Sequence, residues 1–515
     1  MWLNPAQRIP SSPARKTGMM NSRHVLPPPL RHPDRFYIGG EWVEPSSAAA
    51  FDVVDPVTEV TYFSVALARA DDMARAVAAA RLAFDDGPWP RLSHAERAGF
   101  LRAIADGLRK RADDLAQIWP REVGVLHSLA RLSGDGAAET FDQFADLAAT
   151  YPFRQRVTPA TGGFGLLVRE PVGVLGAIIP WNGPMSQIQY KVAPALLAGC
   201  TVVLKPSPEA PGEALILAEI ADEIGLPPGV LNVVSADRDV SELLVTDPRV
   251  DRITFTGSTA AGRRIASLCG ERIARCTLEL GGKSAAVILD DFDIATAAVT
   301  LAQGQYVMSG QLCAALTRVI VPRGRHDELV DAIADVFGRA VIGDPFDGET
   351  QLGPLAMRRQ RDRVEGYIAK GVAAGATLAA GGGRPAHLDR GWYVSPTVFG
   401  HVDNRSVIAR EEIFGPVLSV IPADDERHAV ELANDSIYGL NSSVFTNDVD
   451  RALEIAGQLQ AGTVGHNAMR GDPAIAFGGF KQSGIGREGG AEGLGELLET
   501  KLIILTGPPA GEVTG

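Results

Sequence analysis

The sequence has few cysteines, and this shortage excludes two classes of protein. Its 515 residues contain only Cys200, Cys269, Cys276 and Cys313. Cysteines scattered in this way argue against a disulfide framework and against a zinc site, and they are typical of a reducing compartment. We therefore expect a cytoplasmic protein with no structural metal.

The sequence also lacks a long apolar run and an excess of basic residues. No stretch reaches the roughly 18 apolar residues of a membrane span. The net charge is −13, which argues against a nucleic-acid partner because the phosphate backbone needs a basic protein face. Hydrophobic residues at 45% and charged residues at 22% are ordinary for a soluble protein, and the length allows two to four domains. We expect neither a nucleic-acid nor a membrane partner.

Residues 1–33 contain no acidic residue, and the first one in the chain is Asp34. Residues 1–33 instead contain seven prolines and several arginines. A basic, acid-free start resembles a transit peptide, but the prolines oppose the amphipathic helix that such a peptide needs. We expect residues 1–33 to form a disordered tail, with ordered structure beginning in the strand-like residues 36–42.

What the chain does contain is an alternation of strand and helix patterns. Residues 71–150 have apolar positions at helical spacing, and Ser93 with Glu96 forms a predicted capping box. Residues 172–258 then alternate between strand and helix, and a second alternating region follows Gly282, with strands near 285–289 and 318–321 and a helix over 326–340. This alternation predicts an α/β fold with parallel sheets.

Cys313 is the strongest candidate for chemistry. It follows a flexible Ser309-Gly310 at the end of an expected helix, whereas the other cysteines lie in apolar or strand-like runs. A buried structural role is the common alternative for a single cysteine. Glu279 lies between two leucines, and burial there would raise its pKa toward that of a general base. An ion pair with Lys283 is the alternative for this carboxylate.

These two residues belong to a set of motifs that resembles the aldehyde dehydrogenase superfamily. The other motifs are residues 180–182 (Pro-Trp-Asn), 255–258 (Phe-Thr-Gly-Ser), 411–416 (Glu-Glu-Ile-Phe-Gly-Pro) and 477–484 (Phe-Gly-Gly-Phe-Lys-Gln-Ser-Gly). The resemblance extends from about residue 36 to about residue 502. It implies two Rossmann-like parallel-sheet domains, one for the cofactor and one for catalysis, and a small β oligomerisation arm.

The resemblance also implies the domain boundaries. The dinucleotide-binding domain is expected over residues 34–153 and 170–281, and the catalytic domain over residues 282–482. Residues 154–169 and 483–515 are expected to form the oligomerisation arm and the C-terminal segment. A homodimer or homotetramer follows from such an arm.

In mechanism, the resemblance implies oxidation of an aldehyde to a carboxylic acid with NAD(P)⁺. Cys313 would attack the aldehyde to form a thiohemiacetal, and the side-chain amide of Asn182 would stabilise its oxygen. Glu279 would then activate water against the thioester. An acylating, coenzyme A-dependent dehydrogenase and a non-catalytic protein with this fold are the two alternatives, and for Asn182 alone the alternative is a helix cap.

The expected cofactor is NAD, with NADP left open. Residues 256–262 follow a strand and open a helix, so their N–H groups can face a pyrophosphate; the alternative is a plain turn with Ser258 as N-cap. Many NAD-preferring relatives have an acid where this chain has Pro208, and Glu209 follows one residue later. The expected cofactor contacts are Trp181, Lys205, Ser207, Glu209, Gly257, Ser258, Gly262, Glu412 and Phe414.

The substrate pocket is implied mainly by the residues that follow Asn182. Gly183 replaces the bulky aromatic residue that is frequent at this place, so the pocket is expected to be roomier and more polar. Arg470 is a candidate partner for a polar substrate tail, and a solvated loop arginine is the alternative. The expected pocket residues are Gly183, Gln187, Tyr190, Leu312, Arg470 and Phe477.

Overall fold

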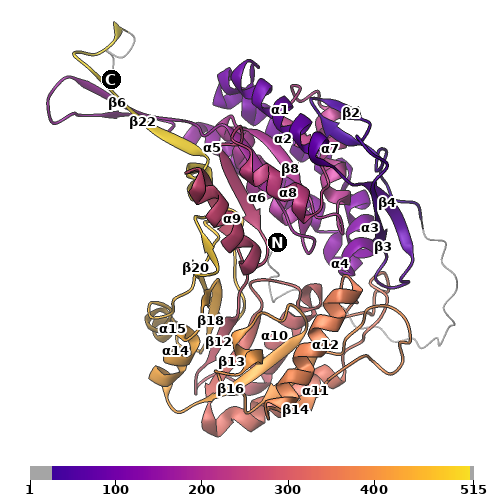
Figure 1. Ribbon diagram of the computed structural model, residues 1–515. Coiled ribbons are helices and arrows are strands. Elements are labelled where there is room, and N and C mark those ends of the chain that lie inside the picture. Colours follow the sequence, from indigo (N-terminus) through magenta and orange to yellow (C-terminus); the bar gives the residue numbers. More distant parts are fainter. Residues whose placement is uncertain (1–25, 511–515) are drawn as a thin grey trace.

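The computed structural model describes residues 26–510 and contains two large sheets, each covered by helices on both faces (Figure 1). The first sheet has eight strands. Its five central strands, in the order β9-β8-β7-β10-β11, are parallel, and the edges are antiparallel. In spatial order the strands are β2 (Glu41–Val43), β1 (Phe36–Ile38), β9 (Leu231–Val233), β8 (Thr201–Lys205), β7 (Val174–Ile178), β10 (Arg252–Thr256), β11 (Arg275–Glu279) and β21 (Gly484–Ile485).

Successive residues of these strands pack into two separate cores, because side chains in a strand alternate between the two faces. Leu175 and Val202 face one core, whereas Val174 and Val203 face the other. Helices α2 (His94–Lys110), α5 (Ser133–Thr150), α6 (Pro184–Ala198) and α7 (Gly212–Glu223) cover the first face; α1 (Ala70–Asp85), α8 (Arg238–Thr246) and α9 (Thr259–Glu271) cover the second.

The second sheet has seven strands and lies below the first in Figure 1. Only its edge strand β14 is antiparallel. In spatial order the strands are β14 (Thr377–Ala380), β15 (Thr397–Gly400), β16 (Val417–Ala423), β13 (Leu316–Pro322), β12 (Ser284–Ile288), β18 (Asn441–Phe445) and β19 (Thr463–His466). Its helices are α10 (Ile294–Tyr306), α11 (His326–Gly338), α12 (Arg358–Ala373), α13 (Val407–Arg410), α14 (Glu426–Asn434) and α15 (Val449–Ala456).

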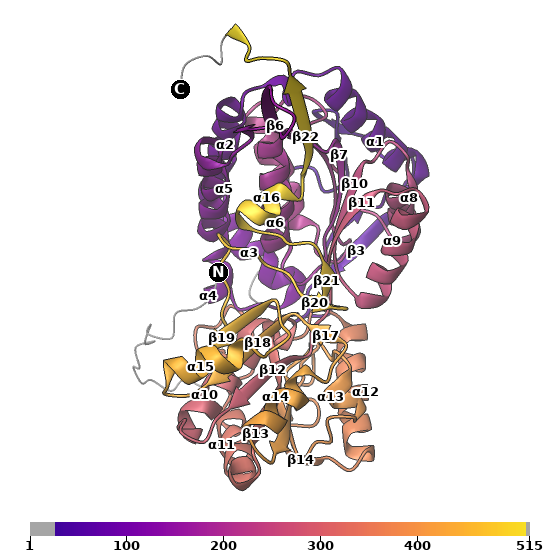
Figure 2. The ribbon, with the colours of Figure 1, turned by 90° about the vertical axis from the view of Figure 1, so that its left-hand side faces the viewer.

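A third, three-stranded sheet projects from the first body as an arm (Figures 1 and 2). It consists of β5 (Arg154–Val157), β6 (Phe164–Pro171) and β22 (Leu498–Leu505), all antiparallel. The remaining elements are β3 (Ala50–Val54), β4 (Thr61–Ala66), η1 (Trp89–Arg91), α3 (Ala112–Val123), α4 (His127–Ala130), η2 (Val307–Gly310), η3 (Arg323–Arg325), β17 (Tyr438–Gly439), β20 (Phe480–Lys481) and α16 (Gly490–Gly495).

The predicted α/β class is confirmed, and the predicted strands and helices of the alternating regions end within two residues of the observed ones. The Ser93 capping box is present at the start of α2. One feature differs from prediction, because each sheet has at least one antiparallel edge. Within the C-terminal segment, β21 pairs with β11 in the first sheet.

The predicted disordered tail, residues 1–33, includes residues near its C-terminal end that are ordered. Residues 1–25 lie outside the described residues. The backbone of Arg31 donates to Glu219 at 2.7 Å, and the carbonyl of Pro29 accepts from Arg111 at 2.9 Å. Residues 27–33 therefore run against α3 and α7, because prolines that oppose a helix still leave carbonyl groups free to accept hydrogen bonds.

The two large sheets face each other through opposite strand ends. In the first sheet, the residues at or just after the carboxyl ends of β7, β8, β10 and β11 are, in this order, 180–182, 205–209, 257–262 and 279–282. In the second sheet, the residues that precede the amino ends of β12, β13 and β16 are, in this order, 281–283, 310–315 and 411–416. Ligands of open α/β sheets bind outside the carboxyl ends of the strands, where the strand order reverses. The fold thus brings every predicted motif to the zone between the two bodies. None of the helices within residues 26–510 is both long and apolar enough to span a bilayer.

Candidate active site

The cysteine segment, residues 307–313, leaves α10 through an unusual backbone conformation. Met308, Ser309 and Gly310 have φ angles of 51°, 54° and 71°. Residues other than glycine seldom adopt this left-handed region, and clusters of such residues are found at functional sites. A Cβ atom on Gly310 would lie 2.4 Å from the carbonyl carbon of Gly415. The segment is thus packed directly against the loop that leads to β16.

Side-chain hydrogen bonds from distant elements hold the cysteine segment. The side-chain amide of Asn182 donates to the carbonyl of Gln311 at 3.0 Å. The side-chain oxygen of Gln311 accepts from the backbone of Ala356 at 2.9 Å, and the Ser309 hydroxyl donates to the carbonyl of Gly353 at 2.9 Å. Asn182 does not cap α6, which has Gly183 at its N-cap and no side-chain cap bond. The predicted oxyanion donor therefore lies beside the cysteine segment.

Glu279 is buried at the carboxyl end of β11, with 2% of its surface exposed. Neither carboxylate oxygen has a hydrogen-bond partner among residues 26–510. Burial raises its pKa well above the usual value, and the negative charge of Glu488 raises it further. The buried ammonium of Lys283 also has no hydrogen-bond partner in the described part of the chain, so the alternative of a Glu279–Lys283 ion pair is wrong. A carboxyl group whose oxygens are free of other hydrogen bonds can exchange a proton with water.

The Cys313 thiol is partly buried, and its surroundings favour the protonated form. Burial raises its pKa to about 12, and the charges of Glu412 and Glu279 contribute to the increase. A thiolate is the reactive form of cysteine. The thiol must therefore pass its proton to a base before it attacks, and the carboxylates that raise its pKa are the charged groups that act on it.

A buried polar network next to Glu279 was missed by the sequence reasoning. Lys191 and Glu488 form an ion pair at 2.6 Å, with Lys191 also donating to Thr256 at 2.7 Å and to Gln187 at 3.2 Å. Thr254 donates to Glu488 at 2.9 Å. The only sequence signal is the four-residue spacing of Gln187 and Lys191 on α6, because Glu488 is 297 positions from Lys191.

Glu412 and Phe414 lie in the loop before β16. The backbone of Gly282 donates to Glu412 at 3.1 Å, and burial raises the pKa of this carboxyl to about 7. Phe414 has a φ of 65° and packs edge-on against Trp181 with ring centroids 5.4 Å apart. The loop that holds these two residues therefore closes over the residue that precedes Asn182.

The cofactor turn, residues 256–262, joins β10 to α9. The Ser258 side chain accepts from the Ala261 backbone as the N-cap of α9, so the capping role is confirmed. A Cβ on Gly262 would lie 2.4 Å from the side chain of Leu280, so this glycine allows α9 to pack closely on β11. Lys205 ends β8, and burial lowers its pKa to about 8. Its ammonium forms no ion pair with any residue that the structure describes.

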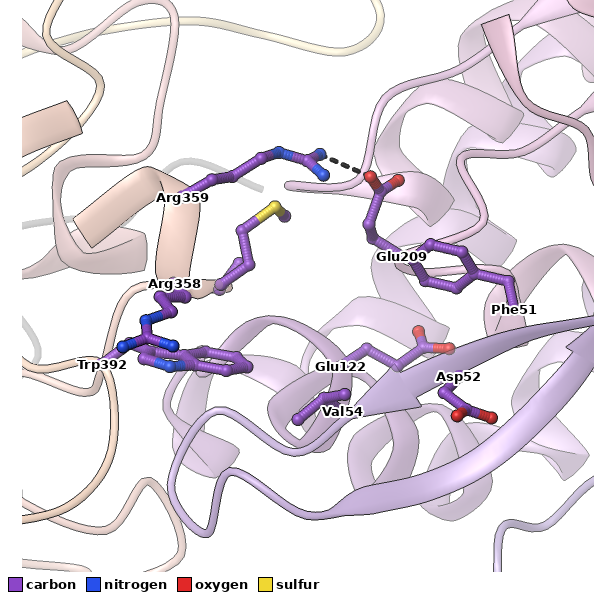
Figure 3. Close-up of a pocket in the computed structure, with 10 residues that line it drawn as sticks. Phe51, Asp52, Val54, Glu122, Glu209, Arg358, Arg359 and Trp392 are labelled. Carbon is purple, nitrogen blue, oxygen red and sulfur yellow. Dashed lines mark hydrogen bonds and ion pairs between the residues drawn. The ribbon is translucent and has the colours of Figure 1, made fainter. Parts of the chain in front are cut away.

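Glu209 does not point freely into solvent. Its carboxylate accepts from Ser207 and forms an ion pair with Arg359 of α12, and these bonds lower its pKa. Figure 3 shows this ion pair across a pocket that residues of both bodies line. The pocket has a volume of about 270 Å³, and its lining includes Phe51, Asp52, Val54, Glu122, Glu209, Met357, Arg358, Arg359 and Trp392.

The predicted substrate residues fall into two groups. Tyr190 and Phe477 stack with nearly parallel rings 6.2 Å apart, and Leu312 packs with Met308 in one apolar cluster. A Cβ on Gly183 would lie 3.7 Å from the methyl group of Met308. Gln187 joins the Lys191 network described above. Arg470, by contrast, is exposed, and its side chain donates weakly to the carbonyl of His466 at 3.4 Å.

Two histidines and an aspartate form a separate polar cluster at the start of α11. The backbone of His401 donates to Nε2 of His326 at 3.0 Å, which places the His326 proton on Nδ1. Nδ1 lies 2.7 Å from Asp327. This hydrogen-bond pattern satisfies the His326 ring without a metal ion.

The chain matches the Aldehyde dehydrogenase family over residues 42–503. It is 44% identical over 472 residues to the geranial dehydrogenase of Castellaniella defragrans, covering 92% of this chain and 98% of that protein. It is 42% identical over 480 residues to the 3-succinoylsemialdehyde-pyridine dehydrogenase of a Pseudomonas species, covering 92% and 99%.

Solved structures agree with these matches. The aldehyde dehydrogenase of Mycobacterium tuberculosis, complexed with NAD⁺, superimposes with a TM-score of 0.90 at 44% identity and covers 93% of this chain and 99% of its own. A mutant of aldehyde dehydrogenase C from Pseudomonas syringae, in complex with NAD⁺ and octanal, superimposes with a TM-score of 0.89 at 42% identity, covering 93% and 98%. The fold is that of the NAD(P)-dependent aldehyde dehydrogenases. The chain belongs to the aldehyde dehydrogenase family, which confirms the predicted resemblance.

Proposed function

We propose that this enzyme oxidises an aldehyde to a free carboxylic acid, with Cys313 as nucleophile, Asn182 as oxyanion donor and Glu279 as general base. The buried, unpartnered carboxylate of Glu279 carries the proposal. A buried acid with both oxygens free costs stability unless it has a functional partner such as water or substrate. Its electrostatic effect on the Cys313 thiol supports a common site.

The first step is addition of the Cys313 sulfur to the aldehyde carbon. The thiol proton leaves to a base, a carbon–sulfur bond forms, and the carbonyl electron pair moves onto the oxygen. The side-chain amide of Asn182, which the bond to Gln311 fixes beside the cysteine segment, is the proposed donor to this oxygen, and the backbone N–H of Cys313 is the proposed second donor. One preorganised donor of this kind contributes about 3 kcal/mol.

The second stage releases the acid. When bound, NAD⁺ supplies the hydride acceptor, and the oxidised carbon remains attached to sulfur as a thioester. Glu279 takes a proton from water, the water oxygen bonds to the acyl carbon, and the carbon–sulfur bond breaks. Burial raises the pKa of Glu279, and its carboxylate is therefore a stronger base toward water than an exposed carboxylate.

NAD is the proposed cofactor, and the residues present fit it. The N-terminus of α9 can hold a pyrophosphate through its backbone N–H groups. The buried, unpaired Lys205 at the end of β8 suits an oxygen-rich ligand. We propose Gly257, Ser258 and Gly262 at the pyrophosphate and Glu412, Phe414 and Trp181 near the nicotinamide end. Lys205, Ser207 and Glu209 are proposed at the adenosine end.

We propose a substrate with an extended apolar chain. The stacked Tyr190 and Phe477 and the cluster around Leu312 supply apolar walls, and Gly183 leaves room beside them. The relatives named for geranial and the complex with octanal support such a chain. Gln187 is a weaker source of polarity than expected because Lys191 and Thr256 already engage its oxygen.

We further propose the predicted domain division and a cytoplasmic homo-oligomer. The exposed Leu502 and Ile504 on the projecting arm support self-association, since exposed apolar strands favour pairing with another chain. The division assigns residues 34–153 and 170–281 to the cofactor domain and 282–482 to the catalytic domain, with 154–169 and 483–515 as the arm and C-terminal segment.

Rapid mixing of Glu279→Gln enzyme with octanal and NAD⁺, with and without coenzyme A, tests the proposal. The amide fills the same space but cannot take a proton from water. We expect a stoichiometric burst of NADH followed by almost no turnover. Cys313→Ala should give no burst, whereas the control Cys269→Ala should keep full activity. Turnover that depends on coenzyme A in the unaltered enzyme would contradict a hydrolytic mechanism.

A further inference from the structure

Trp119 connects helix α3 to the proposed oxyanion residue. The side chain is 5% exposed, and its indole Nε1 donates to the backbone carbonyl of Asn182 at 3.0 Å. The two residues are 63 positions apart in the chain. A buried indole N–H normally finds a partner, but here the partner is the peptide group of the residue that is proposed to stabilise the transition state.

The same indole belongs to an apolar cluster that includes residues next to Asn182 and Cys313. Met308 of the cysteine segment belongs to this cluster, and Trp181 and Leu312 pack on it. Trp181 precedes Asn182 in the chain, and Leu312 precedes Cys313. Packed interiors transmit small displacements because they have little free volume. A shift of the indole is therefore expected to be transmitted through this cluster toward Trp181 and Leu312.

The peptide that follows Asn182 has few other restraints. The next residue is Gly183, which has no side chain to fix its conformation and forms no side-chain cap on α6. The Asn182 side chain itself is held by one bond, to the carbonyl of Gln311 at 3.0 Å. The bond from Trp119 thus fixes the backbone carbonyl of Asn182, and the bond to Gln311 fixes its side-chain amide.

We propose that Trp119 is a positioning residue that orients the Asn182–Gly183 peptide and thereby aims the Asn182 amide at the substrate oxygen. This inference rests on the oxyanion role proposed for Asn182. Hydrogen-bond donors in such sites act through geometry, and a displacement of about 1 Å can cost a large part of the rate. The indole does not contact the reacting atoms in this account.

The test is a double-mutant cycle with Trp119→Phe and Asn182→Ala, read as the rate constant of the NADH burst with octanal and NAD⁺. Phenylalanine retains most of the packing and removes the N–H donor. We expect Trp119→Phe to slow the burst about tenfold and to leave the KM for NAD⁺ unchanged. In the Asn182→Ala background it should cause no further loss, because residues that act through one interaction are not additive.

Trp89→Phe is the matched control. Trp89 is fully buried, and its indole N–H has no hydrogen-bond partner within the residues that the structure describes, so the substitution should leave the burst rate unchanged. The burst rate constant does not depend on the fraction of folded enzyme, so a partly unfolded variant still reports on Trp119.

Three results would separate the possible failures. Equal slowing by Trp119→Phe in both backgrounds would overturn the positioning role. An unchanged rate in Trp119→Phe together with slowing by Asn182→Ala would overturn it and leave the proposed function intact. An unchanged rate in Asn182→Ala would instead refute the oxyanion role on which this inference rests.

Discussion

The cofactor turn follows β10 and opens α9, whereas the cysteine segment follows α10 and leads into β13. Local residues specify the turn: Ser258 caps the helix and Gly262 allows close packing on Leu280. Distant residues specify the segment, since Asn182 and Gly415 hold it from other loops. Capping requires only neighbours in sequence. A strained backbone persists only when its surroundings over-determine it, so the two regions should respond differently to mutation.

Gly310→Ala should break the cysteine segment and give the largest effect. The methyl group would meet the Gly415 backbone at 2.4 Å, and alanine disfavours the φ of 71°. We expect a loss of about 3 kcal/mol in the free energy of unfolding and roughly a hundredfold loss of activity. Urea unfolding and steady-state kinetics measure these two changes.

Gly304→Ala is the control for that substitution. Gly304 lies within α10, six positions earlier, and a Cβ there would meet nothing within 4 Å. Alanine in a helix interior should add about 0.5–1 kcal/mol to the stability and leave activity intact. Equal effects of the two substitutions would show that the cysteine segment is not held by its contact with Gly415.

The comparison explains what the sequence could and could not predict. Alternation of strand and helix patterns predicted the strands that end near Lys205 and Thr256, and the turn at Ser258 carried its own capping signal. The positive φ values of Met308 and Ser309 had no such signal, because these residue types do not favour that conformation. Pairs such as Lys191 and Glu488 arise only when the fold joins segments 297 positions apart.

The charge environment of the cysteine segment is also imposed from a distance. Glu412 raises the pKa of the Cys313 thiol, which reaches about 12, so the thiolate is scarce at neutral pH. Glu412→Gln removes this negative charge and should lower the thiol pKa. A decrease of one unit would make alkylation about tenfold faster at any pH below the midpoint. Peptide-level labelling of Cys313 by iodoacetamide over a range of pH, without NAD⁺, measures the midpoint.

Glu411→Gln is the neighbouring control for this titration. Glu411 is exposed and accepts a hydrogen bond from Tyr367, and it is not among the groups that act on Cys313. Its replacement should leave the labelling profile unchanged. An identical profile in both variants would mean that the charge of Glu412 does not contribute to the pKa of the thiol.

The Glu209–Arg359 ion pair is a contact between distant residues at the proposed cofactor site, and it tests whether such contacts also influence cofactor choice. Glu209→Gln should improve the use of NADP relative to NAD, because it removes a negative charge from the proposed adenosine end and frees Arg359 for a phosphate. Arg359 already neutralises part of that charge, so we expect a gain of about fivefold in the kcat/KM ratio, or about 1 kcal/mol. The double variant with Arg359→Ala should lose the gain, and an unchanged ratio in Glu209→Gln would remove both residues from cofactor choice.

Ser258→Ala should give the smallest effect and shows whether the cofactor turn is more than a helix cap. Loss of an N-cap costs about 1 kcal/mol of stability, and Asp293→Ala, at the N-cap of α10 with a bond to Thr296 at 2.8 Å, should cost about the same. If Ser258 also contacts the pyrophosphate, only its replacement will raise the KM for NAD⁺. If the two variants lose equal stability and neither changes that KM, the turn holds the cofactor through its backbone alone, and local capping then accounts for the whole role of the Ser258 side chain.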